Sequence, residues 1–259
     1  MAMVLTISEF ISEVQRLGGI PNANTDQLRE QLEELFDIEG YEDYWKDTIQ
    51  DLDLPYAVEV FTRLEQTGYF KYTSPELKDL VLLYHIVWFN EEGLYNDSLH
   101  GPESILLIDR RFIFLDSEYL CEPGGFQFFL INLKLATDEM GVPLVYEERC
   151  EQDAEGKYIY RMSVNGRHYT FHLDSENFAH AALKTILIFN RELELQQLPE
   201  RLYPISVGTD GAVMLLTPEQ QQLVAGLIPD VQNKPLPLEE WCKVFKVPFY
   251  GDDPESYHV

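Results

Sequence analysis

The segment from Lys157 to Leu173 constrains the fold more than any other part of the sequence. Asn165-Gly166 lies near its centre, and this dipeptide is typical of the two-residue turn of a β-hairpin. Such a turn aligns three apolar or aromatic pairs, namely Met162 with Tyr169, Tyr160 with Phe171, and Tyr158 with Leu173. Side chains alternate along a strand, so all three pairs share one face. The sequence therefore predicts an antiparallel hairpin with one buried face. The opposite face is polar and carries Arg161, Ser163, His168, Thr170 and His172.

Further strands and helices are predicted around this hairpin. Residues 142–149 indicate a strand, and residues 176–196 place apolar side chains at helical spacing. A second hairpin is predicted from residues 203–207 and 213–216, which flank the turn sequence Gly208-Thr209-Asp210-Gly211. A short helix follows over residues 217–227. The predicted order over residues 141–230 is β-β-β-α-β-β-α.

The prolines after residue 228 predict an extended tail over residues 231–259. This tail includes Trp241 and Phe245, which are costly to leave exposed on a monomer. We therefore expect the tail to dock against the body of the protein, although docking on a partner is the alternative.

Residues 1–140 are predicted to be mainly helical. Thr6 and Glu9 form a capping-box pattern before apolar residues at helical spacing. Thr25 is the predicted cap of a second helix, and Pro55 suits the first turn of another. The remaining predicted helices cover residues 41–52, 75–92 and 126–140. Residues 105–115 fit either a strand or a helix.

Helices followed by antiparallel hairpins indicate an α+β fold. In this fold a helical N-terminal half precedes an antiparallel sheet of hairpins with packed helices. The length of 259 residues allows one large domain or two smaller ones. A boundary near residue 140 and a single fused domain are both compatible with the pattern.

The charge balance restricts the classes of partner. The chain contains 45 acidic and 19 basic side chains, which gives a formal net charge of −26. Such a surface repels the phosphates of nucleic acids and anionic membranes. It attracts cationic proteins and accelerates their encounter. The alternative is that the charge serves solubility alone.

The cysteines and the N-terminal sequence bear on the compartment. Cys121, Cys150 and Cys242 are odd in number and widely spaced, which argues against a disulfide framework and a zinc knuckle. The first residues lack the basic and apolar regions of a secretory signal. Charged residues interrupt the apolar stretches, so no segment is predicted to span a bilayer. We therefore expect a cytoplasmic protein.

Acidic residues are concentrated in residues 26–53, called here the acidic belt. Its eleven acids are Asp26, Glu30, Glu33, Glu34, Asp37, Glu39, Glu42, Asp43, Asp47, Asp51 and Asp53. Only Arg29 and Lys46 oppose them, and Tyr41, Tyr44 and Trp45 are interleaved. Aromatic anchors among carboxylates are typical of surfaces that bind arginine- and lysine-rich proteins. The alternative is a solvated side of two helices whose aromatic residues lie in the core.

The predicted partner-binding residues come from the centre of this belt. They are Glu33, Glu34, Asp37, Glu39, Glu42, Asp43 and Tyr44.

The sequence contains no recognisable catalytic or cofactor motif. The G-x-S-x-G pattern and the phosphate-binding glycine loops are absent. The imidazoles of His168, His172 and His180 could bind a metal ion only if the fold brought them together. His168 and His172, however, are about 13 Å apart along a strand, which is too far for both to bind one ion. Asp153, Glu155 and Lys157 imitate a nuclease pattern, but they lie in a predicted turn. We therefore predict no catalytic residue, no metal site and no cofactor.

The chain resembles the immunity proteins of bacterial polymorphic toxin systems. The resemblance is one of general character over residues 140–230, which contain Val164-Asn165-Gly166-Arg167-His168-Tyr169-Thr170-Phe171 and the segment from Gly208 to Glu219. It implies tight, stoichiometric binding to a cognate toxin domain. The sequence thus predicts a non-catalytic acidic protein that neutralises a basic toxin domain. The alternatives are a cytoplasmic hydrolase built from scattered acids and histidines, and an adaptor or scaffold acting through its helical half. The oligomeric state stays open.

Overall fold

The computed structural model describes most of the chain. The described residues are 5–35, 52–87, 89, 111–117, 119–121, 124–152, 154, 158–173, 178–206, 211–228 and 230–256. Contacts within the chain define two compact units. The first comprises Met1–Asp109 with Leu227–Pro229, and the second comprises Arg110–Gly226 with Asp230–Val259. Residue 140, where the sequence suggested a boundary, lies inside the second unit because the helix ending there packs into that unit's core.

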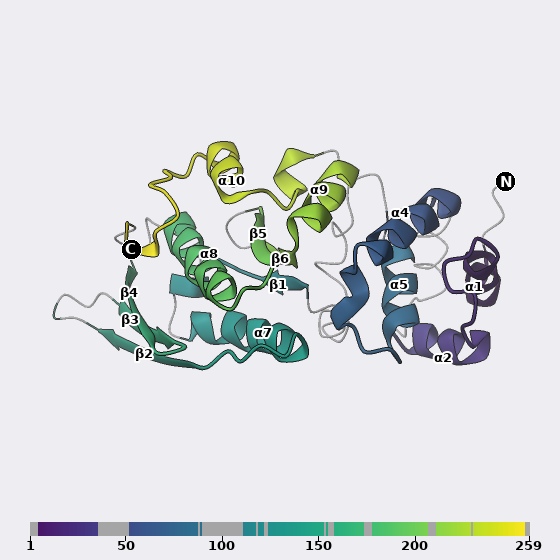
Figure 1. The fold of residues 1–259 in the computed structure, drawn as a ribbon, viewed down its shortest axis with the longest axis horizontal. Helices are drawn as coiled ribbons and strands as arrows, with labels where there is room; N and C mark the ends of the chain where they lie inside the picture. Colours follow the sequence, from purple (N-terminus) through teal and green to yellow (C-terminus); the bar gives the residue numbers. More distant parts are fainter. Residues whose placement is uncertain are drawn as a thin grey trace. The chain divides into compact units, whose positions relative to one another are not determined.

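The described part of the first unit is helical, as predicted. Its elements are α1 (Ile7–Arg16), α2 (Thr25–Leu35), α4 (Leu54–Gln66), the 3-10 helix η1 (Tyr69–Tyr72) and α5 (Lys78–Val87) (Figure 1). Contacts join α1 to α2, α2 to α5, and α4 to α5 and η1. The predicted helix over residues 41–52 lies almost wholly outside the described residues.

Local capping explains where these helices begin. The Thr6 hydroxyl accepts a hydrogen bond from the Glu9 amide, and the Glu9 carboxylate accepts one from the Thr6 amide, so the predicted capping box is confirmed. Asp53 caps α4 by accepting from the Tyr56 amide at 3.2 Å. The predicted cap Thr25 is instead the first residue of α2. Asn24, one residue earlier, lies 3.4 Å from the Gln27 amide through its Oδ1 atom.

The second unit contains both sheets. Its strands are β1 (Phe112–Phe114), β2 (Tyr146–Gln152), β3 (Tyr158–Val164), β4 (Arg167–Leu173), β5 (Arg201–Ile205) and β6 (Ala212–Leu216). Its helices are η3 (Tyr119–Cys121), α7 (Gly125–Glu139), α8 (Phe178–Leu195), α9 (Pro218–Leu227), η5 (Val231–Asn233), α10 (Leu238–Phe245) and η6 (Pro254–Ser256). The predicted α+β class is thereby confirmed.

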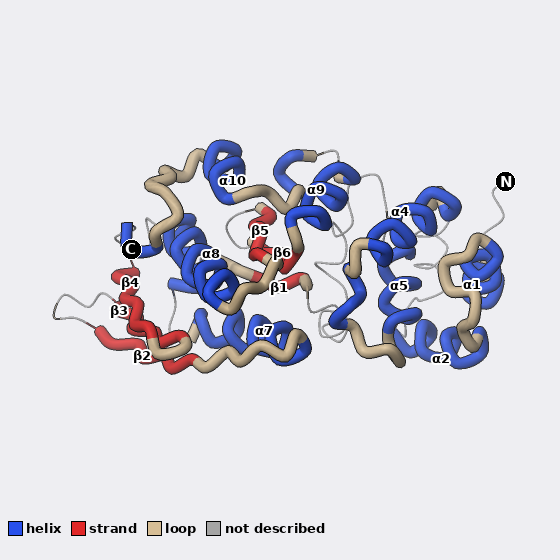
Figure 2. The backbone as a smooth tube through the Cα atoms, in the orientation of Figure 1, coloured by secondary structure: helices blue, strands red, loops and turns tan. Residues whose placement is uncertain are grey.

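The strands form two antiparallel sheets of three, ordered β2-β3-β4 and β1-β6-β5 (Figure 2). The register of the first hairpin is the predicted one, with Met162 opposite Tyr169, Tyr160 opposite Phe171, and Tyr158 opposite Leu173. The second predicted hairpin is also confirmed as β5 and β6. It belongs to a separate sheet because β1, from the segment left open between strand and helix, pairs with β6.

One helix joins the two sheets into a single core. α8 contacts β4 of one sheet and β5 of the other, and Figure 1 shows it running between them. Residues 181–189 of this helix are all buried. Phe189 packs on Phe129 of α7 with ring centroids 5.5 Å apart, while Phe126 packs on Phe171 of β4 at 4.8 Å. The buried middle of α8 is therefore held by packing from several directions.

The segment predicted as an extended tail is partly helical. It contains η5, α10 and η6, because residues 238–245 place Trp241 and Cys242 on one side of a short amphipathic helix. Trp241 is buried in the core of the second unit, and its indole Nε1 donates to the Ser206 carbonyl at 2.7 Å. The segment thus docks on its own unit, the outcome expected from the cost of exposing Trp241.

Candidate functional site

The structure describes two of the seven predicted partner-binding residues. Glu33 and Glu34 lie in the last turn of α2. The other five, Asp37, Glu39, Glu42, Asp43 and Tyr44, lie outside the described residues. Of the acidic belt, the structure describes residues 26–35, which lie on α2, and residues 52 and 53.

Helix α2 separates apolar from acidic side chains. Leu28 and Leu32 are buried, whereas Asp26, Glu30 and Glu34 are exposed. These three acids are spaced four residues apart, so they form one row along the exposed side of the helix, called here the acidic row. Like charges at this spacing repel one another and destabilise the helix. A cationic surface placed against the row would relieve this repulsion.

The basic side chains of the first unit are largely engaged within it. Arg29 donates from Nη1 to both carboxylate oxygens of Glu33 at 3.1 Å, and its Nη2 lies 3.9 Å from Glu30. Arg16 pairs with Glu13 on α1. Lys78 pairs with Glu65, which links α5 to α4. These cations are taken up locally, so they leave the acidic row largely uncompensated.

The excess of acid is uneven along the chain. Residues 1–109 contain 22 acidic and 6 basic side chains, whereas residues 110–259 contain 23 and 13. The shorter segment therefore carries an excess of 16 acids and the longer one an excess of 10. The first 109 residues therefore carry the higher density of negative charge.

The histidines that the structure describes do not gather into a metal site. His168 and His172 are exposed on the outer face of β4, as predicted, and His180 is half-buried with its ring 6.2 Å from that of Tyr250. No set of three or more histidine, cysteine or acidic residues within the described ranges could hold a metal ion. Of the nuclease-like residues, Asp153, Glu155 and Lys157, none lies within the described residues.

An open groove of ≈ 670 Å³ lies on the β2-β3-β4 sheet. Arg149 and Arg161 lie directly opposite each other in it, on β2 and β3. Glu151 approaches both guanidinium groups, at 2.8 Å from Arg149 and 3.6 Å from Arg161. The two like charges are thus bridged by one carboxylate, which offsets the repulsion expected of such a cross-strand pair.

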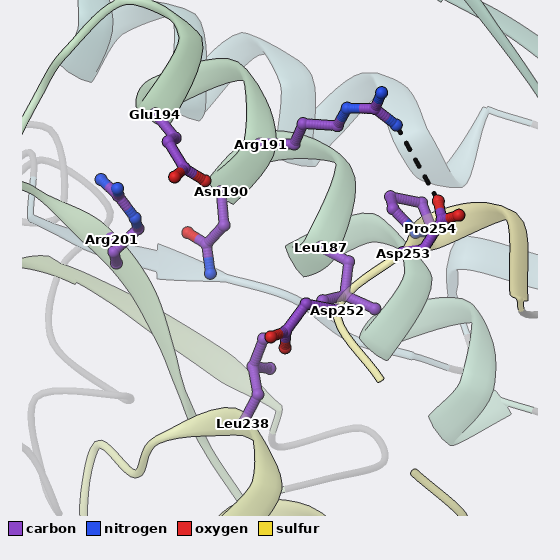
Figure 3. A pocket seen from close by; sticks show the side chains of 9 residues that line it. All are labelled: Leu187, Asn190, Arg191, Glu194, Arg201, Leu238, Asp252, Asp253 and Pro254. Atoms are coloured by element: carbon purple, nitrogen blue, oxygen red, sulfur yellow. Dashed lines mark ion pairs between the residues drawn. The ribbon is translucent and has the colours of Figure 1, made fainter. Parts of the chain in front are cut away.

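A second hollow lies beside α8 and is called here the α8 cavity (Figure 3). Its volume is ≈ 490 Å³. Its lining residues are Leu187, Asn190, Arg191, Glu194, Arg201, Leu238, Asp252, Asp253 and Pro254. They come from α8, β5, α10 and the segment that leads into η6, so chain segments distant in sequence meet at one place.

Several side chains of the α8 cavity are fixed by hydrogen bonds. The Asn190 amide donates to the Leu202 carbonyl at 3.1 Å and accepts from the Leu202 amide at 2.7 Å. Arg201 donates from Nη1 to the carbonyls of Leu198 and Glu200, both at 2.7 Å. Arg191 lies 3.9 Å from Asp253. The bonds of Asn190 hold α8 against β5, whereas the exposed ion pair between Arg191 and Asp253 contributes little to holding the C-terminal segment.

A buried carboxylate, Glu192, anchors the last turns of α8. Glu192 accepts hydrogen bonds from the Arg167 guanidinium and from the side-chain amide of Asn165, the latter at 3.1 Å. The Tyr169 hydroxyl also donates to the Glu192 carboxylate, at 3.3 Å. Burial raises the pKa of Glu192, but the hydrogen bonds from Arg167 and Asn165 outweigh it, so the pKa lies below its ordinary value. Glu192 therefore stays ionised and ties the first hairpin to α8.

The α8 cavity was missed by the sequence reasoning, which named none of its residues as a site. Asn190, Arg191 and Glu194 are polar residues close together near the end of α8, and this grouping was the available signal. Arg201 and Asp252 carry no such signal, because their approach to α8 depends on the tertiary fold.

No family model matches the chain, and comparisons with curated proteins and with solved structures give no significant match. Within the described ranges, every helix is too short or too polar to cross a membrane. Any functional conclusion therefore rests on the residues themselves.

Proposed function

We propose that this chain is a non-catalytic binding protein that neutralises a cation-rich protein domain, in the manner of the immunity proteins it resembles. The acidic row of α2, formed by Asp26, Glu30 and Glu34, belongs to the contact surface. The partner supplies arginine and lysine side chains that pair with these carboxylates.

The uncompensated acidic row is the observation on which this proposal depends. Its carboxylates repel one another along one side of α2, and the nearest cation, Arg29, is bound mainly to Glu33 and only loosely, at 3.9 Å, to Glu30 of the row. The surrounding segment of 109 residues carries 22 acids against 6 bases, so its field extends well beyond the helix. A surface of this kind favours rapid encounter with a basic protein.

The interface predicted from this charge is fast and sensitive to salt. Exposed charges are screened over about 8 Å at physiological ionic strength. The association rate is therefore expected to fall as salt is added, while the dissociation rate depends on the buried centre of the interface. The interleaved aromatic residues of the acidic belt are the proposed source of that centre.

The proposal is tested by measuring association with the basic carboxy-terminal domain of a toxin-type protein encoded beside this chain. Stopped-flow fluorescence gives the association rate of the wild type and of the double variant Glu30→Lys/Glu34→Lys. We expect a decrease of about tenfold for this variant, because it reverses the field where the partner approaches.

The matched control reverses two exposed acids of the second unit, Glu219→Lys and Glu240→Lys. It changes the net charge by the same amount, and we expect an effect of less than about twofold. Equal effects in the two double variants would remove α2 from the interface. Failure of the wild-type chain to bind the domain would overturn the proposed function itself.

A further inference from the structure

We infer that the outer edge of β2 is a self-association surface, on which β2 of a second copy of this chain pairs antiparallel about a twofold axis at Cys150. The pairing joins the β2-β3-β4 sheets of two chains into one continuous sheet. The inference concerns the second unit alone and does not rest on the proposed function, which concerns α2 of the first unit.

The two edges of this sheet differ. β3 lies between β2 and β4, so β2 and β4 each have one side without a neighbouring strand (Figure 2). On β4, Lys184 of α8 donates to the Thr170 carbonyl at 2.7 Å and occupies the middle of that edge. On β2, no backbone hydrogen bond from another described segment reaches Glu148 or Cys150. Within the described residues, β2 is therefore the edge on which a further strand can pair.

The direction of the β2 backbone groups follows from the register with β3. Along an antiparallel strand, residues whose N–H and C=O groups face one neighbour alternate with residues whose groups face away. The Asn165 amide donates to the Val145 carbonyl at 2.7 Å, so every second residue from Val145 onward, including Arg149, faces β3. The outward-facing residues of β2 are Tyr146, Glu148, Cys150 and Gln152.

This alternation limits how two β2 strands can pair. Outward-facing residues must lie opposite one another, so the central positions for the twofold axis are Glu148, Arg149 and Cys150. An axis at Arg149 places Arg149 opposite itself and Glu147 opposite Glu151. An axis at Glu148 places two copies of a carboxylate opposite each other, and its Oε2 atom is buried without a hydrogen-bond donor among the described residues. Like charges directly opposite are destabilising, which disfavours both positions.

An axis at Cys150 gives complementary charges. It places Arg149 opposite Glu151 of the second copy and, by symmetry, Glu151 opposite Arg149. On the other side of the strand it places Glu148 opposite the neutral Gln152. The alternating charges of β2, which discourage pairing with an unrelated strand, therefore favour a second copy of the same strand.

The contacts within one chain leave Arg149 available for this pairing. Its guanidinium lies 2.8 Å from Glu151 of its own chain, yet its side chain is 77% exposed. A guanidinium has five N–H donors, so it can bind a second carboxylate without releasing the first. Glu151 in turn has two carboxylate oxygens, each able to accept more than one hydrogen bond.

Sedimentation equilibrium of the full chain measures the self-association. Salt at about 0.3 M screens the repulsion between two chains that each carry a net charge of −26. We expect a monomer–dimer equilibrium with a Kd on the order of 100 µM, because the paired edge is short. Arg149→Glu should weaken it by at least about tenfold, since two pairs of opposite charge become two pairs of like charge.

A charge exchange separates this pairing from a general effect of charge. The double variant Arg149→Glu/Glu151→Arg re-forms both pairs with their signs exchanged, and we expect its Kd to return to within about threefold of the wild type. The matched control Arg161→Glu makes the same change of charge on β3, one strand away from the edge. It should alter the Kd by less than about twofold. Circular dichroism confirms that each variant is folded.

Cys150 reports the register of the pairing. Its thiol is exposed whereas Cys242 is buried, so Cys150 is the accessible one of these two in a Cys121→Ser background. Opposed residues that exchange backbone hydrogen bonds have Cα atoms about 5.5 Å apart. An axis at Glu148 would instead separate the two copies of Cys150 by about 13 Å. We therefore expect 1,2-ethanediyl bismethanethiosulfonate, a short reagent that links two thiols, to join two chains through Cys150.

A proline tests the backbone of the edge itself. Cys150→Pro removes an outward-facing N–H, which an edge strand tolerates, but it prevents a further strand from pairing there. We expect this variant to be monomeric. His172→Pro, at an outward-facing position on the β4 edge, is the matched control and should still form the dimer.

Four results would overturn the inference. They are a wild-type chain that stays monomeric at about 500 µM, equal weakening by Arg149→Glu and Arg161→Glu, no recovery in the charge exchange, and a dimer that is not linked through Cys150. All are measured on the chain alone, so none of them bears on whether the acidic row of α2 binds a basic protein.

Discussion

The two units of the molecule use charge in opposite ways. In the first unit the acids of the row on α2 are exposed, and the local cation Arg29 is engaged mainly by Glu33 outside the row. In the second unit several charged side chains are buried, and each has a defined partner. Glu192 is bound by Arg167, Lys184 donates to the Thr170 carbonyl at 2.7 Å, and Arg111 donates to the Leu215 carbonyl at 2.8 Å.

This difference separates charge that specifies packing from charge that is available for recognition. A buried ion requires its partner, since leaving either one alone in the core is costly. An exposed excess of one sign requires no internal partner and weakens the unit that carries it. Neutralising the buried Glu192 should therefore destabilise the second unit, whereas neutralising an exposed acid of the acidic row should stabilise the first.

The largest effect is expected for Glu192→Gln. The substitution keeps the shape but removes the charge that binds Arg167. Glu192 is buried while the Arg167 side chain is 41% exposed, so the cost falls below that of a fully buried pair, to about 2 kcal/mol. Hydrogen exchange of the amides in β4 and α8 measures the loss locally. Glu194→Gln, two residues away and exposed, is the matched control and should change exchange by less than about 0.5 kcal/mol. Equal protection in both variants would mean that Glu192 does not hold the hairpin on α8.

Because of Glu192, the stability of the second unit should fall at acidic pH. The pKa of Glu192 is lowered on folding, so its stabilisation is complete above the unfolded value of about 4.3 and is lost as the pH falls through the folded value. The stability gap between wild type and Glu192→Gln, measured by denaturant unfolding, should therefore shrink below about pH 4. A gap that stays constant down to pH 3 would contradict the ionised state assigned to this group.

A smaller effect is expected at the start of the first unit. Thr6→Ala removes the hydroxyl that accepts from the Glu9 amide at 3.3 Å, and the loss of such a cap costs about 1 kcal/mol. Exchange of the first amides of α1 reports the change. Ser8→Ala, an exposed position in the same turn, serves as the control and should leave exchange nearly unchanged.

The smallest expected effect is a gain in stability, opposite in sign to the loss expected for Glu192→Gln in the second unit. Glu30→Gln removes two like-charge contacts, with Asp26 and Glu34, and should stabilise α2 by about 0.3 kcal/mol. The long ion pair to Arg29 that is lost is exposed and worth little. The gain, followed by exchange of the α2 amides, should vanish in high salt. A loss of stability would show that the acidic row has a structural role.

Sequence alone predicts the parts of this fold that depend on local pattern. The turn at Asn165-Gly166 and the alternation around it determine the register of the first hairpin, because one residue of slip would expose the whole apolar face. The capping box at Thr6 follows from the same kind of local rule. The division into two sheets does not, since the pairing of β1 with β6 joins segments about a hundred residues apart.

The candidate sites show the same limit. The exposed acids of α2 follow from helical spacing, which separates Glu30 and Glu34 from the buried Leu28 and Leu32. The α8 cavity instead brings Arg201 and Asp252 to a helix that precedes both in the chain. Neither residue type nor spacing indicates that meeting. It is determined by the packing of α10 and the C-terminal segment on the second unit.

Asn165 has a consequence for how this protein can be altered. Its backbone adopts φ 49°, its Oδ1 accepts from the Val145 amide at 3.0 Å, and its Nδ2 donates to Glu192. Tips of hairpins ordinarily accept inserted peptides and exchanged loops. This tip is instead a junction between the strand before it, the hairpin and a core helix. A tag or graft placed there would disturb the interior of the molecule. Glycine at this position would adopt the backbone conformation of the turn but would lose the side-chain hydrogen bonds to Val145 and Glu192.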